Sequence, residues 1–182
     1  MDVPETDLVA SAQSGNRAAF GSLYERYMEQ IYRYVYYRVS DRDEAEDLTE
    51  TIFVKAWEAL PRFQSRGATF RAWLYRIAHN AVIDRHRTRK TVVPLEQAQN
   101  WLDVETSSPE EAAEAAQESA RLGIALSQLK PRLREVILHR FVNGLSHAET
   151  AQTMGLRKGH VRVLQHRALN QMRDLLTKGQ VQ

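Results

Sequence analysis

Basic side chains crowd one stretch near the C-terminal end of the chain, and their types and spacing suit the binding of a polyanion. Residues 157–167 contain six side chains that can carry positive charge: Arg157, Lys158, His160, Arg162, His166 and Arg167. At helical spacing they lie on the outer side of one helix, where arginine can pair with phosphates and with guanine edges in the DNA major groove. The alternative is a plain helical hairpin with a basic, solvated face.

The sequence around these residues predicts a helix-turn-helix. Ser146 and Glu149 have the spacing of a capping box, so a helix begins there. Gly155 suits a turn that needs a left-handed backbone. Ala151 falls where two helices would cross closely, and Val161 packs the second helix against the first. This combination favours a DNA-binding element over the plain hairpin.

A second basic block covers residues 62–90, where eight Lys or Arg residues accompany a single acid, Asp84. Aromatic residues are interleaved with the arginines, which suits unstacked bases and a single-stranded backbone. By spacing, Phe70, Trp73 and Ile77 belong to a core instead. The remaining candidate contacts are Phe63, Arg66, Arg76, Asn80, Arg85 and Arg87.

An acidic helix is predicted over residues 41–60, beginning at a possible capping box of Asp41 and Glu44. Its negative charge repels phosphate, so it does not suit nucleic acid. The acidic face ends in Phe53 and Trp57, which suits a protein partner with basic residues. A solvated helix face is the alternative.

Helical periodicity runs through nearly the whole chain, which predicts an all-α fold. We expect two small helical domains, residues 1–90 and 109–182, joined by a flexible linker over 91–108, where no periodicity is visible. The net charge of +2 conceals two basic blocks separated by an acidic spacer, which indicates two polyanion-binding surfaces. A helix beginning at Pro131 should place four residues on its inner face: Leu133, Val136, Ile137 and Phe141.

Enzymatic and metal-binding motifs do not stand out. The chain has no cysteine, which excludes thiolate zinc sites and a cysteine nucleophile. It has no nucleophile elbow, phosphate loop or His-Glu-x-x-His motif. No two of the six histidines are four apart, so a helical histidine pair is not expected, and His139 is interpreted as a satisfied or partly exposed side chain. We therefore expect no cofactor and no catalytic activity.

The acidic N-terminus lacks a basic and apolar leader, and no apolar run reaches the length of a membrane span. We therefore expect no membrane insertion and a cytoplasmic location.

Three segments together resemble bacterial RNA polymerase sigma factors of the sigma-70 family. Residues 43–57 are similar to the part of region 2 that binds the polymerase clamp. Residues 70–80, followed by Asp84-Arg85, are similar to the segment that recognises and melts the minus-ten element. Gly144-Leu145-Ser146 and residues 159–168 are similar to region 4, which recognises the minus-thirty-five element. The absence of further regions indicates the extracytoplasmic-function (ECF) group.

This resemblance implies core RNA polymerase and promoter DNA as partners, and an anti-sigma factor as regulator. It implies polymerase contacts at Asp47, Glu50, Phe53 and Trp57. It assigns the candidates of the 62–90 block to the minus-ten element and the six basic residues of 157–167 to the minus-thirty-five element.

The sequence departs from the family at three places. Glu50-Thr51 stands where Gln-Glu is usual, Arg157 stands at the usual Ser or Thr cap of the recognition helix, and Leu164 stands where a basic residue is frequent. The alternative function is a helix-turn-helix regulator that does not associate with core polymerase. A response regulator would need alternating strands and helices in residues 1–90, where only helices are predicted.

Overall fold

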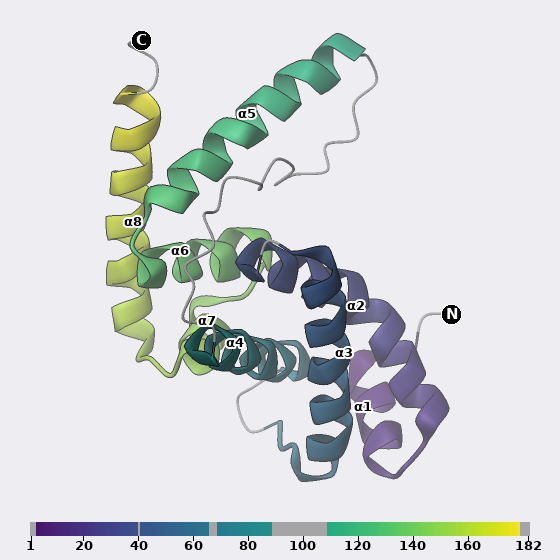
Figure 1. Ribbon diagram of the computed structural model, residues 1–182. Helices are drawn as coiled ribbons and strands as arrows, with labels where there is room; N and C mark the ends of the chain where they lie inside the picture. Colours follow the sequence, from purple (N-terminus) through teal and green to yellow (C-terminus); the bar gives the residue numbers. More distant parts are fainter. Residues whose placement is uncertain (1–2, 40, 66–68, 89–108, 179–182) are drawn as a thin grey trace.

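The structure is a computed structural model that describes residues 3–39, 41–65, 69–88 and 109–178. These residues are helical throughout apart from turns, which confirms the all-α prediction (Figure 1). The linker predicted over 91–108 lies outside the described residues. In chain order the elements are α1 (Glu5–Gln13), α2 (Arg17–Val39), α3 (Arg42–Ala59), the 3-10 turn η1 (Leu60–Arg62), α4 (Phe70–Thr88), α5 (Pro109–Gln128), α6 (Pro131–Ile137), the π turn η2 (Leu138–Val142), α7 (His147–Met154) and α8 (Lys158–Lys178).

Side-chain caps begin several of these helices. At α7 the capping box is complete: the Ser146 hydroxyl accepts from the Glu149 amide at 3.2 Å, and the Glu149 carboxylate accepts from the Ser146 amide at 2.7 Å. At α3 only one arm forms, in which the Asp41 carboxylate accepts from the Glu44 amide at 2.8 Å. The Glu44 side chain instead pairs with Arg85 of α4 at 2.6 Å. The cap of α3 is therefore simpler than expected, and Glu44 connects α3 to α4.

Helices α1–α4 enclose the larger core. Its centre consists of side chains with no exposed surface, among them Leu23, Ile31, Ile52 and Leu74. Along each helix the buried residues recur mostly at three- and four-residue steps, so each helix contributes one apolar stripe. Aromatic rings fill the end near η1, where Phe63 lies against Phe70 and Trp73.

Helices α5–α8 form the C-terminal half. Ala151 and Val161 are buried together with Val136 in the small core of the helix-turn-helix. Gly155 ends α7 with φ +64°, which an L side chain rarely adopts, so the predicted left-handed turn is confirmed.

The inner face of the helix that begins at Pro131 differs from the prediction at one residue. Phe141 is 56% exposed, whereas Leu138 and His139 are buried. The reason is η2: a π turn bonds each amide to a carbonyl five residues back, so the helical face shifts by one residue. The 3.6-residue pattern therefore fails after Ile137.

The two halves pack against each other, which the sequence did not predict. Tyr37 of α2 is buried in a core formed with Leu126, Leu138 and Ala168 of the C-terminal half. Conversely, Leu145 is fully buried in the core of α1–α4. Figure 1 shows α7 lying beside α4 at the centre of the molecule. We call this the docked arrangement.

Candidate nucleic-acid interface and inter-domain contact

The outer face of α8 is the candidate interface with duplex DNA. Val161, Leu164 and Ala168 are buried against the rest of the C-terminal half. This leaves the six predicted basic positions exposed: Arg157, Lys158, His160, Arg162, His166 and Arg167. The structure thus brings together, on one helix and the residue just before it, every residue that the sequence assigned to this surface.

The candidate minus-ten residues on α4 are also exposed, namely Arg76, Asn80, Arg85 and Arg87. Arg85 forms an ion pair with Glu44, and Arg87 forms an exposed ion pair with Asp84 at 4.0 Å. Arg66 lies outside the described residues. Arg76 and Asn80 are four residues apart, so they share one side of α4.

Phe63 was expected as a contact, but the structure places it in the core. Its side chain is 9% exposed, and its ring centroid lies 4.9 Å from that of Trp73 and 6.1 Å from that of Phe70. Phe63 follows the η1 turn and lies beside the rings of Phe70 and Trp73. The hydrophobic effect favours burial of its ring at this place. In this structure Phe63 supports α4 and does not offer a surface to DNA.

The acidic helix α3 carries the candidate polymerase contacts, and they divide into two kinds. Asp47 and Glu50 are exposed. Phe53 is only 4% exposed and packs edge-on against Tyr24 at 4.7 Å. Trp57 is half-buried beside Phe20. In this structure Phe53 is therefore a core residue and the acidic side chains form the available surface, while polymerase contact by these residues stays a prediction.

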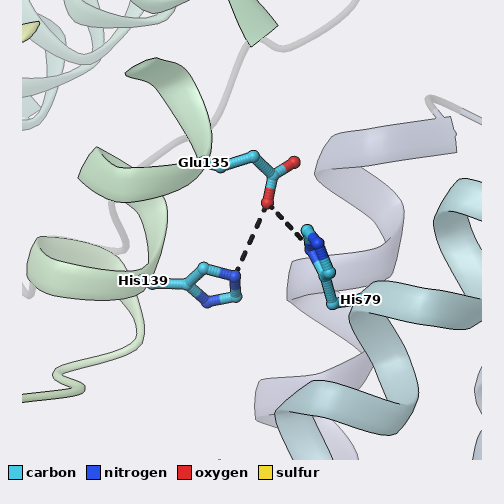
Figure 2. Close-up of side chains that lie close together, drawn as sticks. All are labelled: His79, Glu135 and His139. Carbon is cyan, nitrogen blue, oxygen red and sulfur yellow. Dashed lines mark ion pairs between the residues drawn. The ribbon is translucent and has the colours of Figure 1, made fainter. Parts of the chain in front are cut away.

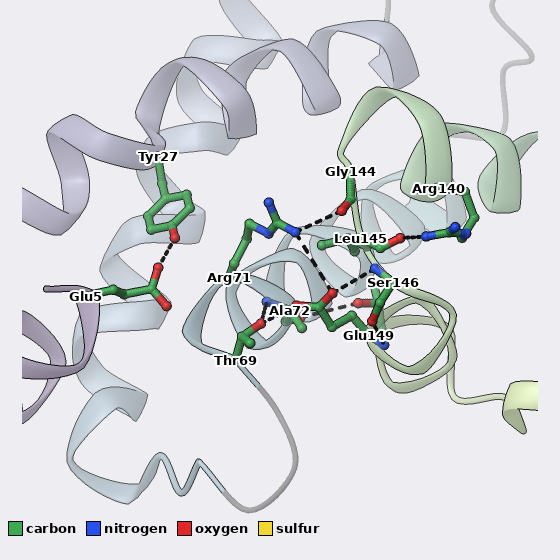
Figure 3. A network of polar contacts seen from close by, with 11 residues as sticks. Glu5, Tyr27, Thr69, Arg71, Ala72, Arg140, Gly144, Leu145, Ser146 and Glu149 are labelled. Carbon is green, nitrogen blue, oxygen red and sulfur yellow. Dashed lines mark hydrogen bonds and ion pairs between the residues drawn. The ribbon is translucent and has the colours of Figure 1, made fainter.

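Polar contacts join α4 and Thr69, just before it, to α7 and the turn that precedes α7 (Figure 3). Thr69 donates to a Glu149 carboxylate oxygen at 2.5 Å, and Arg71 donates to the Gly144 carbonyl at 2.9 Å. Burial tends to raise the pKa of Glu149, but hydrogen bonds from Thr69 and Ser146, with the nearby Arg71, hold that pKa below its usual value. Deeper in the contact, Thr153 donates to the Ala72 carbonyl at 3.3 Å. The capping box of α7 is thus also an attachment point for α4.

A buried cluster lies between α4 and the continuous segment α6–η2 (Figure 2). His79 Nδ1 lies 3.2 Å from Glu135 Oε2, and His139 Nε2 lies 3.5 Å from the same oxygen. Arg38 of α2 forms an ion pair with the other oxygen, Glu135 Oε1. Burial, with the positive charge of Arg38, lowers the pKa of His79 to about 4. Burial, with the nearby His79 and Arg38, also lowers the pKa of His139 well below its usual value, so both imidazoles are neutral near pH 7.

Sequence reasoning missed this cluster. Glu135 and His139 are four residues apart, which is the spacing of side chains that meet on a helix. That spacing was present in the sequence, but only a pair of histidines was expected to mark a metal site on a helix. The contribution of His79 could not be anticipated, because it comes from a helix more than fifty residues earlier and depends on the docked arrangement.

Comparisons with known proteins agree with this geometry. Residues 23–92 match the family model described as Sigma-70 region 2, and residues 125–174 match the one described as Sigma-70, region 4. The ECF RNA polymerase sigma factor SigD of Mycobacterium tuberculosis is 35% identical over 173 residues, which cover 92% of this chain and 81% of SigD. The chain belongs to the ECF family of RNA polymerase sigma factors.

Two further relatives extend the comparison. The ECF RNA polymerase sigma factor BldN of Streptomyces coelicolor is 38% identical over 93% of this chain, and the chain spans 65% of the length of BldN. The solved structure of CnrH in complex with the cytosolic domain of CnrY is 28% identical, covers 96% of this chain and 97% of that chain, and has a TM-score of 0.71. CnrH is a sigma factor of Cupriavidus metallidurans.

Family membership confirms that this ECF sigma factor is not an enzyme and that its chemistry is recognition. Sigma factors bind core RNA polymerase and promoter DNA. Region 2 corresponds to α2–α4, and region 4 corresponds to the end of α5 through α8. Within the described residues, no helix is long and apolar enough to cross a bilayer.

Proposed function

We propose that this chain directs core RNA polymerase to promoters by binding duplex DNA through α8 and a melted strand through α4. The observation that carries the proposal is the exposed basic face of α8, on a helix-turn-helix whose turn, crossing and cap all have the required geometry. Arg162 and Arg167 contact base edges or flanking phosphates, with His166 on base or sugar. Arg157 and Lys158 contact phosphate at the helix N-terminus, where backbone amides favour an anion.

In the same proposal, region 2 has two partners. Asn80 recognises an unstacked base of the minus-ten element, with Arg76, Arg85 and Arg87 along the strand. Asp47 and Glu50 contact basic residues of core polymerase. The chain acts in the cytoplasm, where the polymerase is.

The docked arrangement does not match simultaneous recognition of both promoter elements. Elements centred near positions −10 and −35 lie about 25 base pairs apart, or about 85 Å at about 3.4 Å per base pair. A compact chain of this length has a radius of gyration of about 16 Å. Regions 2 and 4 must therefore separate before both can contact one promoter, and the docked arrangement is an inactive conformation.

An anti-sigma factor is the proposed regulator. The support is the likeness to CnrH, which was solved in complex with the cytosolic domain of CnrY. The likeness extends over nearly the whole of this chain, both regions included. A protein that binds the docked arrangement in preference to the separated one would keep the regions together by mass action.

Run-off transcription tests the proposal. Core polymerase with this chain, on a genomic promoter library, should give discrete transcripts that core polymerase alone does not give. A variant that replaces both Arg162 and Arg167 with alanine should bind core polymerase but lose those transcripts. A helix-turn-helix regulator without polymerase association would instead bind DNA and leave core polymerase without promoter-specific initiation.

A further inference from the structure

The cluster between α4 and α6 has the composition of a metal site. His79 comes from region 2, whereas Glu135 and His139 come from region 4. They are 8%, 5% and 0% exposed, and their three ligand-type atoms all lie within 4.8 Å of one another. Two imidazoles and a carboxylate are a ligand set that zinc takes in proteins. Figure 2 shows both rings directed toward the same carboxylate.

The spacing of these atoms fits a tetrahedral ion. Zinc bonds of about 2.0–2.2 Å separate neighbouring ligand atoms by about 3.3–3.6 Å at a tetrahedral angle. The two contacts of Glu135 Oε2, 3.2 Å to His79 and 3.5 Å to His139, match that range closely. The Tyr34 hydroxyl lies 3.3 Å from His79 Nδ1 and 3.5 Å from Glu135 Oε2, so it is a neighbour of two of the three ligand-type atoms.

The surroundings orient these groups as ligands. His139 Nε2 is buried and has no hydrogen-bond partner, although it faces the cluster. Its other nitrogen, Nδ1, lies 3.2 Å from the Asn143 side-chain amide, which can accept from Nδ1–H after a 180° rotation. Arg38 binds Glu135 Oε1 and leaves Oε2 for an ion. Such supporting contacts are typical of ligating histidines and carboxylates.

We propose that His79, Glu135 and His139 bind a divalent ion of the zinc class and thereby join region 2 to region 4. Tyr34 supplies the fourth corner. Because the ligands belong to both regions and are buried only when these dock, the ion binds the docked arrangement and not the separated one. The ion therefore acts as a latch, and its removal favours the promoter-competent conformation. Only this last consequence rests on the proposed function.

The competing interpretation is a polar network made by the protein alone. In that case both imidazoles donate to Glu135 Oε2, and the positive charge of Arg38 repels a further cation. The two interpretations differ in a direct observable, which is stoichiometric metal binding that depends on residues of both regions.

The experiment uses the full chain, freed of metal with a chelator and titrated with Zn²⁺ by calorimetry. We expect one Zn²⁺ per chain at micromolar protein concentration, with at least about tenfold weaker binding for His79→Ala and for Glu135→Gln. His147→Ala is the matched control, since His147 lies on α7 outside the cluster, and it should bind as the wild type does. Circular dichroism establishes that each variant is folded.

A second measurement reports the geometry. Co²⁺ in place of Zn²⁺ should give the strong visible absorption of a tetrahedral site, and Tyr34→Phe should alter that spectrum. Absence of stoichiometric binding to the wild type, or equal binding by the wild type, His79→Ala and Glu135→Gln, would overturn the proposal. These readouts involve no polymerase, so a failure of run-off transcription leaves them interpretable.

Discussion

The outer face of α8 and the contact between α4 and α6–η2 are both rich in polar groups, but these groups are exposed to water on α8 and largely buried in the contact. On α8 the basic side chains are exposed to water and gathered on one face. Between α4 and α6–η2, Glu135 and two histidines are buried and face one another, and the half-buried Arg38 of α2 pairs with Glu135. The first surface is arranged for a partner outside the molecule, and the second joins the two regions of one chain.

The difference matters because a buried charge depends on its partner far more than an exposed one does. Substitution of a single exposed charged residue should change the stability of the fold little and should alter the binding of a partner. Substitution of a buried one should affect mainly the docked arrangement. Substitutions at the two surfaces should therefore separate regulation from recognition.

The largest effect is expected from Arg38→Ala. It leaves the buried carboxylate of Glu135 without its ion-pair partner, which typically costs about 3–5 kcal/mol. The regions should separate at a lower urea concentration, as followed by fluorescence energy transfer between them. Arg42→Ala is the control, because it removes an exposed i,i+4 pair with Glu46 and should change the midpoint little. Equal midpoints for the two variants would show that the buried pair does not stabilise docking.

On α8, Arg162→Ala should weaken promoter binding by about 1–3 kcal/mol and relax the preference at one position. Lys158→Ala should weaken all sequences alike and lower the salt dependence by about one unit. The change of sequence preference and the change of salt dependence can be measured in one assay. The full chain, in complex with core polymerase, is bound to a promoter library at several salt concentrations. A uniform loss for both variants, without a change of preference, contradicts base recognition by Arg162.

Asn80→Ala should cost roughly 1 kcal/mol, the contribution of a hydrogen bond to a base edge. Because that contact forms only after the base has left the stack, the loss should appear in open-complex formation and not in initial binding. Permanganate reactivity of melted bases, beside a gel-shift assay of the closed complex, separates the two steps. The same loss at both would make Asn80 a structural residue.

The smallest effect is expected for Asp47→Lys. Asp47 is exposed, and exposed ion pairs typically contribute about 0.2–1 kcal/mol, so core polymerase should bind a few-fold more weakly while the fold is unchanged. Glu25→Lys, an exposed acid on α2, is the control. Wild-type affinity of Asp47→Lys for core polymerase would make this carboxylate merely a solvated charge.

Local rules were enough to predict much of this molecule. The cap at Ser146, the turn at Gly155 and the exposed basic face of α8 follow from residues within one or two helical turns. The same rules did not predict the burial of Phe63 and Phe53, because a sequence pattern shows that an aromatic ring lies on a helix or turn but not how deeply its neighbours cover it.

The inter-domain contact was beyond local rules for two reasons. The π turn at residues 138–142 shifts the helical face, so it buries His139 and exposes Phe141. The partners of Glu135 come from α2 and α4, and only the docked arrangement brings them within reach. Pairings across such sequence separations leave no periodic signal in a single sequence.

The central claim is that regions 2 and 4 dock in the free chain and separate on a promoter. Since the chain has no cysteine, labels at Glu25→Cys and Arg173→Cys, both exposed, report the distance between α2 and α8 by electron spin resonance. We predict a single, narrowly distributed distance in the free chain. With core polymerase and promoter DNA, the distance should lengthen toward the ~85 Å that separates the two elements. The same distance in both states, or a broad distribution in the free chain, would contradict the account.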